Sequence, residues 1–462
     1  MLGGGKRVFN KFLLAQKKKK TSVSKKTLNY EKILNIITLL IFGLSFLFII
    51  FEWYDKSVVA LAGALLMIFF GVLTPEEAYF AVEYETILLL MAMMLLVNIS
   101  SQSGIFNWLS TKIAAITKGN PLKIFILFSL TTAVLSAFLD NVTTVILIIP
   151  ITIQLVKGMG KDPKPIVFAE IIFSNIGGAL TLIGDPPNII IGGATGFSFL
   201  DFILNLWIPI LMSTIFAMIV FCITYWKKIK PITNDLVKLQ IANILIKKIQ
   251  YSFIKKTMHI DFIIKSIAIL LLTVICFFMQ EQIGLPTYLI AFGSTILLAI
   301  LTSNRIEIHK SFEAVEWTTL FFFAGLFIMV AGIEKTGILE QVSHFIANST
   351  SNIFYLSLLI LWISGFVSMI LDNIPFVTIM IPVILGIQTQ FAIDTSILWW
   401  SLSLGACLGG NATLVGASAN LVSVDIAKKN GVKITFLEYM KFSFPLTIGV
   451  LILCSGYLFF VT

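Results

Sequence analysis

Long apolar segments alternate with short polar ones along almost the whole chain. The clearest candidates for bilayer-spanning helices cover residues 33–51, 58–73, 86–99, 202–226, 262–279, 285–301, 318–333 and 446–461. Apolar helices of about this length cross a hydrocarbon core of roughly 30 Å. Two further apolar stretches, at about 122–157 and 353–390, are too long for one crossing and carry a polar Asp-Asn pair near the centre. The pattern predicts an all-α integral membrane protein that crosses the cell membrane many times.

The composition argues against a soluble protein. Apolar residues make up 58% of the 462 residues and charged residues 12%, and the mean hydropathy is +0.97, whereas soluble domains carry about 25% charged residues. The first apolar segment starts too far from the N-terminus for a signal peptide, and no small-residue cleavage site follows it. The four cysteines lie in apolar segments without CxxC spacing, which indicates helix packing rather than a disulfide or metal site. They are Cys222, Cys276, Cys407 and Cys454.

Basic residues are concentrated in two segments. Residues 1–32 contain ten Lys or Arg and one acid, and residues 227–256 contain eight Lys and one Asp. Polybasic segments beside membrane spans usually stay cytoplasmic and can contact anionic lipids. Nucleic-acid binding is the alternative interpretation, and the neighbouring spans argue against it. We therefore expect the lipid bilayer as a partner and no nucleic acid.

Two sequence motifs occur twice at one constant spacing. Residues 136–150 read SAFLDNVTTVILIIP and residues 368–382 read SMILDNIPFVTIMIP, an offset of 368 − 136 = 232. At the same offset, residues 176–188 (IGGALTLIGDPPN) match residues 408–420 (LGGNATLVGASAN). Two motifs that keep one spacing indicate an internal duplication.

The duplication divides the chain into four predicted parts. These are a basic N-terminal tail (1–32), a first membrane repeat (33–226), a basic cytoplasmic linker (227–261) and a second membrane repeat (262–462). Each repeat would hold five transmembrane helices and one re-entrant helical hairpin centred on its Asp-Asn pair. Exposed backbone at such a hairpin tip is tolerable only where it lines a protein or water cavity. Because five crossings is an odd number, the second repeat should be inverted.

Loop charges test this topology. One set of loops is basic and would face the cytoplasm together with the linker: Lys112, Lys118, Lys157, Lys161, Lys164, Lys428, Lys429, Lys433 and Lys441. The opposite loops are acidic and would lie outside: Glu76, Glu77, Glu83, Glu85 and Glu281. This agrees with the positive-inside rule from residue 74 onward. The same count places the basic N-terminal tail outside, against the rule, so the side of the tail stays open.

Both repeats contain a span interrupted by glycines. Gly184 and Gly416 would permit a bend, a positive φ or a close approach of the backbone, and Pro186 and Pro187 prevent the first helix from continuing. A broken helix offers free N–H groups at one end and free carbonyls at the other, which suit small ions. The neutral candidates for ligand binding are Asn141, Thr143, Thr181, Gly184, Asn188, Asn373, Asn411, Thr413, Gly416, Ser418 and Asn420.

Carboxylates inside the apolar segments are the most informative residues. Asp140, Asp185 and Asp372 would each be costly in a membrane, which makes them candidates for a functional site. Burial would also allow proton uptake near neutral pH. The alternative is structural: Asp140 and Asp372 would cap helices, and Asp185 would form a turn before Pro-Pro. Glu170, deeper in a span, fits a proton relay or an interhelical hydrogen bond.

These segments carry a family resemblance. SAFLDNVTT with GDPPN, and LDNIPF with GACLGGNATLVGASAN, resemble the signatures of the ArsB/NhaD branch of the ion transporter superfamily, in the group of the melanosomal P protein and its bacterial relatives. The resemblance to this citrate transporter-like group extends from about residue 33 to the end. It implies a fold like that of the divalent anion/sodium symporters, with a scaffold domain, an elevator-like transport domain and a homodimer.

The resemblance also implies where ions bind. Hairpin tips and broken helices would hold substrate and coupling ion, with Na⁺ near Asn141 and Asn373. The dicarboxylate branch of the superfamily carries Ser-Asn-Thr at its tips, whereas this chain has Asp-Asn-Val and Asp-Asn-Ile. Acidic tips disfavour a dianionic substrate unless a cation or proton intervenes.

The predicted function is secondary active transport of a small ion or oxyacid, of the arsenite/anion or Na⁺/H⁺ type, coupled to H⁺ or Na⁺ and without a cofactor. An uncoupled ion channel is one alternative. A membrane-embedded enzyme is another, and His259, His309 and His344 are too scattered to favour it. No Walker A motif is present, so ATP-driven transport would need a separate ATPase subunit.

Overall fold

The computed structural model describes residues 25–51, 53–117, 120–230, 260–350, 352–389 and 395–462. Within these residues all regular structure is helical, and nine helices are long and apolar enough to cross a membrane. The predicted all-α, multi-pass membrane protein is therefore confirmed. The predictions for the N-terminal tail and for most of the linker fall on residues 1–24 and 231–259, outside the described residues.

Each helix of the first repeat has a counterpart in the second, which contains the short helices α14 and η1 in addition. The first repeat comprises α2 (Lys25–Ile50), α3 (Lys56–Phe69), α4 (Pro75–Ala81), α5 (Tyr84–Gln102), α6 (Ile105–Thr117), α7 (Pro121–Phe138), α8 (Asn141–Gly158), α9 (Lys164–Gly178), α10 (Pro186–Thr195) and α11 (Phe199–Ile229). The second comprises α13 (Ile260–Phe278), α14 (Gln280–Ile283), α15 (Thr287–Leu301), α16 (Ile308–Glu313), α17 (Trp317–Lys335), α18 (Ile338–Ser349), α19 (Ile353–Ile370), α20 (Asn373–Gln388), α21 (Ser396–Gly409), η1 (Gly410–Ala412), α22 (Ser418–Lys429) and α23 (Phe436–Val461). Helix α7 corresponds to α19 at both ends, because 121 + 232 = 353 and 138 + 232 = 370.

One predicted boundary is wrong. The last span was expected to start at residue 446, but α23 begins at Phe436, where Thr435 caps the helix by accepting from the Glu438 amide at 3.2 Å. Glu438 and Lys441 lower the hydropathy of this first part, although the helix continues through them.

Contacts divide the chain into two compact units, which we describe separately. The first contains α2, α3, α4 and the part of α17 from Gly325 to its end. Here α3 and α17 pack closely, since a Cβ on Gly325 would lie 2.6 Å from the Ala60 carbonyl carbon. Lys335 bonds Glu77 at 2.6 Å beside the capping box that begins α4. The units group helices by contact, so the sequence boundaries of the repeats remain a prediction.

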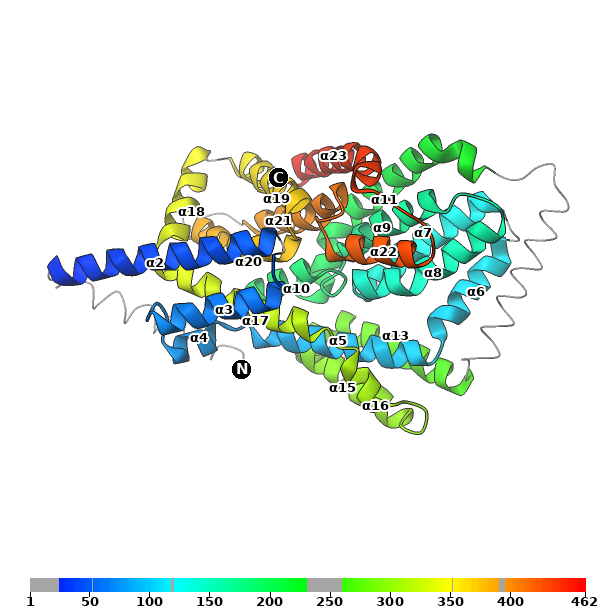
Figure 1. Ribbon diagram of the computed structural model, residues 1–462, viewed down its shortest axis with the longest axis horizontal. Helices are drawn as coiled ribbons and strands as arrows, with labels where there is room; N and C mark the ends of the chain where they lie inside the picture. Colours follow the sequence, from blue (N-terminus) through cyan, green and yellow to red (C-terminus); the bar gives the residue numbers. More distant parts are fainter. Residues whose placement is uncertain (1–24, 52, 118–119, 231–259, 351, 390–394) are drawn as a thin grey trace. The chain divides into compact units, whose positions relative to one another are not determined.

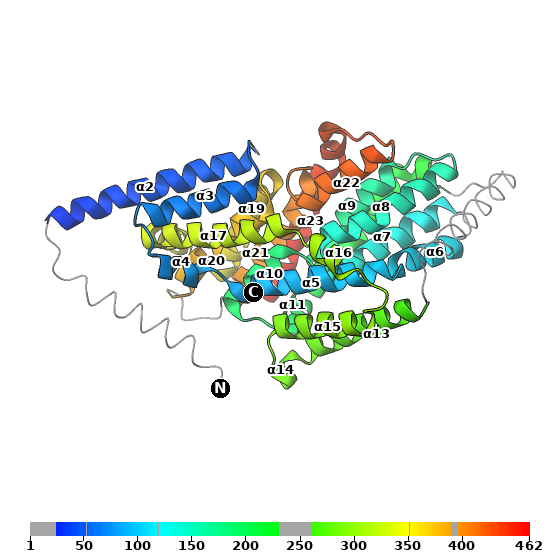
Figure 2. The ribbon, with the colours of Figure 1, turned by 60° about the horizontal axis from the view of Figure 1, so that its bottom comes forward.

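The second unit contains both hairpins and both broken spans. Figures 1 and 2 show α7, α8 and α9 lying side by side. Helix α7 packs on α9 through Gly177, where a Cβ would overlap the Ala133 backbone. Helix α19 packs on α21 through the equivalent pair, and a Cβ on Gly409 would lie 2.5 Å from the Gly365 carbonyl oxygen. Small residues at these positions let the helix backbones approach closely.

One hydrogen bond establishes the inversion of the repeats. Lys157, near the end of α8, donates to the Asn430 carbonyl at the end of α22 at 2.6 Å. The ends of α8 and α22 therefore share one face, and both views place the two helices side by side (Figures 1 and 2). In the first repeat α9 runs back from the end of α8 and α10 continues away from it, so α10 ends on the opposite face. Since α22 is the counterpart of α10, the second repeat is inverted.

Candidate ion and substrate site

Each hairpin tip places an aspartate at the start of its second helix. Asp140 caps α8, because its carboxylate accepts from the Thr143 amide at 2.9 Å and from the Thr143 hydroxyl. Asp372 occupies the same position on α20 without a side-chain cap bond. Its Oδ2 instead accepts from the Ser418 hydroxyl at 2.9 Å. The capping alternative therefore describes Asp140 and not Asp372.

Threonines fasten each break to its hairpin in the same way. Between α9 and α10, Thr181 accepts from the Gly184 amide at 3.1 Å and donates to the carbonyl of Ala137. Between η1 and α22, Thr413 accepts from the Gly416 amide at 3.2 Å. It also donates to a carbonyl at the end of α19 at 2.5 Å. The predicted neutral oxygens of both threonines are thus engaged in holding the backbone of the breaks.

At Gly184 and Gly416 neighbouring backbone segments approach so closely that a side chain would not fit. A Cβ on Gly184 would lie 2.5 Å from the Gly178 carbonyl oxygen and 2.7 Å from that of Ser136. A Cβ on Gly416 would meet two equivalent carbonyl oxygens at 2.6 and 2.7 Å. Neither glycine has a positive φ. The possibility of a left-handed conformation at these positions is therefore wrong, and the confined space explains the glycines.

Buried asparagines join the repeats at the centre of the unit. Asn175 on α9 donates to the side-chain oxygens of Asn411 and Asn420, each at 2.9 Å. Asn420 in turn donates to two carbonyls of its own break at 2.8 Å. Asn188 makes the equivalent bonds in the first break and accepts from Ser403 at 2.6 Å. We call Asn141, Asn175, Asp185, Asn188, Asn373, Asn411 and Asn420 the central cluster; all are buried.

Asn175 was not among the predicted site residues. The only signal for it in the sequence is a polar side chain inside an apolar span, two positions before Gly177. Cys407 occupies the equivalent position of the second repeat and also reaches the central cluster, 3.7 Å from the Asn188 side-chain oxygen.

Asn141 at the first tip is surrounded by oxygen atoms. With its nitrogen directed to the Asn175 oxygen at 3.3 Å, its own oxygen faces the carbonyls of Ser174 and Gly184. With the amide reversed, the nitrogen donates to these carbonyls at 3.0 and 3.1 Å, and the oxygen then faces the Asn175 oxygen. In the first orientation the Asn141 oxygen faces two carbonyls and accepts only from the Ser136 hydroxyl, at 2.5 Å, whereas the reversed orientation forms hydrogen bonds to both carbonyls and is the better satisfied of the two. A bound cation would relieve the first arrangement, because it attracts all of the oxygens.

Asp185 brings a carboxylate to the second tip. It is 3% exposed, and the Asn373 amide lies 3.5 Å from its Oδ2. It also interacts with Cys407, Asp372 and Asn141. Within the described residues it forms no ion pair. Asp185 begins α10, as Asp140 and Asp372 begin α8 and α20, so three of the four helices that start at the tips and breaks carry an acid at the N-terminus.

Glu170 is a second buried carboxyl, outside the central cluster. It is 0% exposed, and its Oε2 lies 2.9 Å from the Thr152 hydroxyl. No described side chain or backbone group bonds its Oε1. Thr152 also lies within bonding distance of two carbonyls of its own helix, at 3.0 and 3.2 Å. Its single proton can serve one of these acceptors, which leaves the hydroxyl able to accept from a neutral Glu170.

Comparison with known proteins supports a transporter. The family model "Citrate transporter" matches residues 46–405. The 46 kDa membrane protein of Mycobacterium leprae is 33% identical over 433 residues, which cover 92% of this chain and 98% of that protein. The P protein of Sus scrofa is 30% identical over 480 residues, covering 87% of this chain and 56% of that protein. The Alcanivorax borkumensis YdaH transporter has a similar fold, with a TM-score of 0.51, 13% identity and coverage of 80% and 83% of the two chains.

Proposed function

Because the chain belongs to the citrate transporter family, we propose that it is a secondary active transporter of a small ion or oxyacid, coupled to Na⁺ or H⁺. The observation that carries this proposal is the central cluster, to which both hairpin tips and both broken spans of two inverted repeats contribute. Discontinuous helices that meet in this way are the recurrent binding-site design of secondary transporters. We place the chain in the ArsB/NhaD branch of the superfamily on the motifs of its tips and breaks.

The charges of the site favour a cation or an uncharged oxyacid over a multivalent anion. Helix N-termini attract anions, but three of the four at this site already carry an aspartate. In the described part of the chain, no Lys, Arg or His bonds a residue of the central cluster. Citrate would therefore need cations bound with it. Arsenite as the neutral acid, silicic acid or an exchanged Na⁺ would meet no such repulsion.

The first hairpin tip offers a site for the coupling cation. If the Asn141 amide turned its oxygen toward the carbonyls of Ser174 and Gly184, the three would form a group of uncharged oxygens, the ligand type that hard cations prefer. A Na⁺ bound there would fix the Asn141 amide in one orientation. At the second tip Asn373 faces Asp185, and we propose that this pair takes up the second cation or a proton.

The same contacts support a proposal for the transport movement. Asn175 fastens α9 of the first repeat to the second break, so the hairpins and broken spans of both repeats would move together. We propose an elevator-like movement of these elements, in a homodimer like that expected from the resemblance.

Flux into proteoliposomes tests the proposal. Purified protein would be reconstituted, and uptake of labelled arsenite, citrate or Na⁺ would be measured under a Na⁺ gradient, a pH gradient or neither. We expect uptake of one substrate to exceed its equilibrium level under one gradient and to stop when that gradient is collapsed. Uptake that never exceeds equilibrium would indicate a channel. The absence of flux for every substrate and gradient would contradict this assignment of substrate class.

A further inference from the structure

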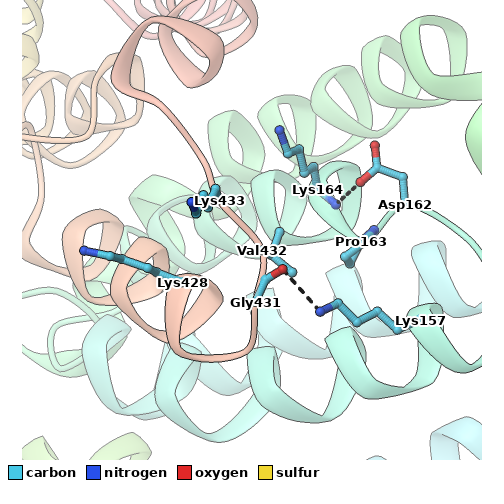
Figure 3. A pocket seen from close by; sticks show the side chains of 8 residues that line it. All are labelled: Lys157, Asp162, Pro163, Lys164, Lys428, Gly431, Val432 and Lys433. Atoms are coloured by element: carbon cyan, nitrogen blue, oxygen red, sulfur yellow. Dashed lines mark hydrogen bonds between the residues drawn. The ribbon is translucent and has the colours of Figure 1, made fainter.

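A basic pocket lies away from the central cluster, on the face where α8 and α22 end. It has a volume of about 380 Å³ and lies between the turn that joins α8 to α9 and the turn that joins α22 to α23 (Figure 3). Its lining comprises Lys157, Asp162, Pro163, Lys164, Lys428, Gly431, Val432 and Lys433. Because the two turns come from different repeats, a ligand in this pocket would contact both.

The positive charge of the pocket exceeds its negative charge. The one acid of the lining, Asp162, binds Lys228 at 2.7 Å. Partial burial raises the pKa of Asp162, but the hydrogen bonds and charges of Lys228 and Lys164 together outweigh this effect, so the pKa of Asp162 is below its ordinary value. Asp162 is therefore ionised and already paired. Lys164 pairs with Glu438 at 2.7 Å.

The other three lysines keep an unneutralised charge. Lys157 donates to the Asn430 carbonyl at 2.6 Å, which is a neutral acceptor. Lys428 and Lys433 form no ion pair with any residue that the structure describes. An anion bound in the pocket would neutralise part of this positive charge.

Helix capping explains only part of this arrangement. Lys157 supplies a donor for the carbonyl end of α22, and Lys428 lies in the last helical turn, where a cation is favoured. Lys433 lies beyond the helix. Gly431, with φ of 71°, reverses the chain so that Val432 is buried while Lys433 lines the pocket.

The lysines of the pocket are not a feature that the two repeats share. The counterpart of the α8–α9 turn is the segment 389–395, TQFAIDT, and the counterpart of the α22–α23 turn is the segment 196–198, GFS. Neither contains a lysine. The counterpart segments therefore lack the lysines found on this face, which the loop charges predict to be cytoplasmic.

We propose that this pocket binds an anionic phosphate group, carried by a lipid headgroup or by a soluble phosphate. Several ammonium groups can share the oxygens of one phosphate, and lysine commonly binds phosphate as a point charge. The volume is within the range of small-ligand sites. Basic pockets between transmembrane helices on the cytoplasmic side are suited to anionic headgroups. A bound phosphate would connect the α8–α9 turn of the first repeat to the α22–α23 turn of the second.

Titration of the purified full chain in neutral detergent tests this site. The probes are inorganic phosphate, dioctanoyl phosphatidylglycerol, dioctanoyl phosphatidylcholine and citrate, with Kd measured by calorimetry. The variant Lys428→Gln/Lys433→Gln removes two lysines whose charges have no described ion-pair partner. The matched control, Lys429→Gln/Lys441→Gln, removes the same charge from exposed neighbours outside the lining. Melting temperature without probe shows that both variants are folded.

We expect saturable binding that weakens by about tenfold or more in the pocket variant and by less than about twofold in the control. Binding of both inorganic phosphate and phosphatidylglycerol would identify a general phosphate site. Binding of phosphatidylglycerol alone would identify a headgroup site. Equal binding of phosphatidylcholine, equal loss in both variants, or binding of citrate without phosphate would overturn the proposal. None of these outcomes depends on transport through the central cluster.

Discussion

The two hairpin tips have the same backbone and use the same Asp-Asn pair differently. Asp140 caps its own helix, whereas Asp372 accepts from Ser418 at the start of α22. Asn141 faces the carbonyls of its own repeat, and Asn373 faces Asp185 of the other. The comparison indicates that the first Asp-Asn pair contacts groups of its own repeat, whereas the second pair also reaches Asp185 of the other repeat.

The two broken spans also share a backbone arrangement and differ in their polar side chains. Bonds that hold the backbone are kept in both repeats, as the pairs Thr181 and Thr413, Gly184 and Gly416, and Asn188 and Asn420 show. Side chains that supply chemistry differ: Asn175 corresponds to Cys407, Ala179 to Asn411, and Asp185 to Ala417. The duplicated framework is therefore symmetric, and the polar groups inside it are specialised.

Asp185→Asn should have the largest effect, because it removes the carboxylate that only the first repeat supplies. We expect coupled uptake in proteoliposomes to fall by about 100-fold or more, with little change in melting temperature, since a neutral amide is cheaper to bury than a charge. The matched control is Glu170→Gln, which removes the other fully buried carboxyl of the same repeat, outside the central cluster. Uptake by this control should stay within about twofold of wild type. An equal loss of uptake in both variants would show that transport does not depend on the Asp185 carboxylate more than on any other buried carboxyl.

Much of this arrangement could be read from the sequence. The hairpins at 122–157 and 353–390 match α7–α8 and α19–α20 closely, because their length and central polar pair are local properties. Asn175 could not be found, since its partners lie 236 and 245 positions further along the chain and are brought near only by the inversion. The reason for glycine at residue 184 was equally hidden, because it depends on the carbonyl of Ser136 on the neighbouring hairpin.

Substitution of Gly184 and of Gly416 tests whether the two breaks have equivalent backbone packing. In Gly184→Ala and Gly416→Ala the new Cβ would lie 2.5 to 2.7 Å from backbone carbonyls. Overpacking of this kind costs about 1–3 kcal/mol. We expect both variants to melt at lower temperature by similar amounts, measured without ligand in one detergent. Gly456→Ala, in α23 where a Cβ meets nothing within 4 Å, serves as the control. Loss of stability in only one of the two variants would contradict the equivalence of the breaks.

Replacing the tip aspartates by alanine distinguishes the role of Asp140 from that of Asp372. Asp140→Ala removes a side-chain cap and should lower the unfolding free energy by about 1 kcal/mol. Asp372→Ala removes no cap bond of α20, and it removes the acceptor of the Ser418 hydroxyl. Asp140→Asn keeps a good capping residue and should melt like wild type. If Asp372→Ala lowered the unfolding free energy in a Ser418→Ala background as much as Asp140→Ala does in wild type, the proposed difference in capping would be wrong.

The smallest change in stability is expected when the hydrogen bond from Ser418 to Asp372 is removed. Ser418→Ala removes the donor to Asp372 and should destabilise the protein by about 1 kcal/mol, the usual net contribution of one hydrogen bond. Ser418→Thr keeps a hydroxyl and serves as the control. A double-mutant cycle with Asp372→Ala isolates the pair, because the coupling energy vanishes when the two side chains act independently. The same cycle between Asp140→Ala and Ser418→Ala should give no coupling, since Asp140 bonds within its own helix. Coupling of Ser418 to Asp140 as strong as its coupling to Asp372 would contradict the specialisation of the second tip.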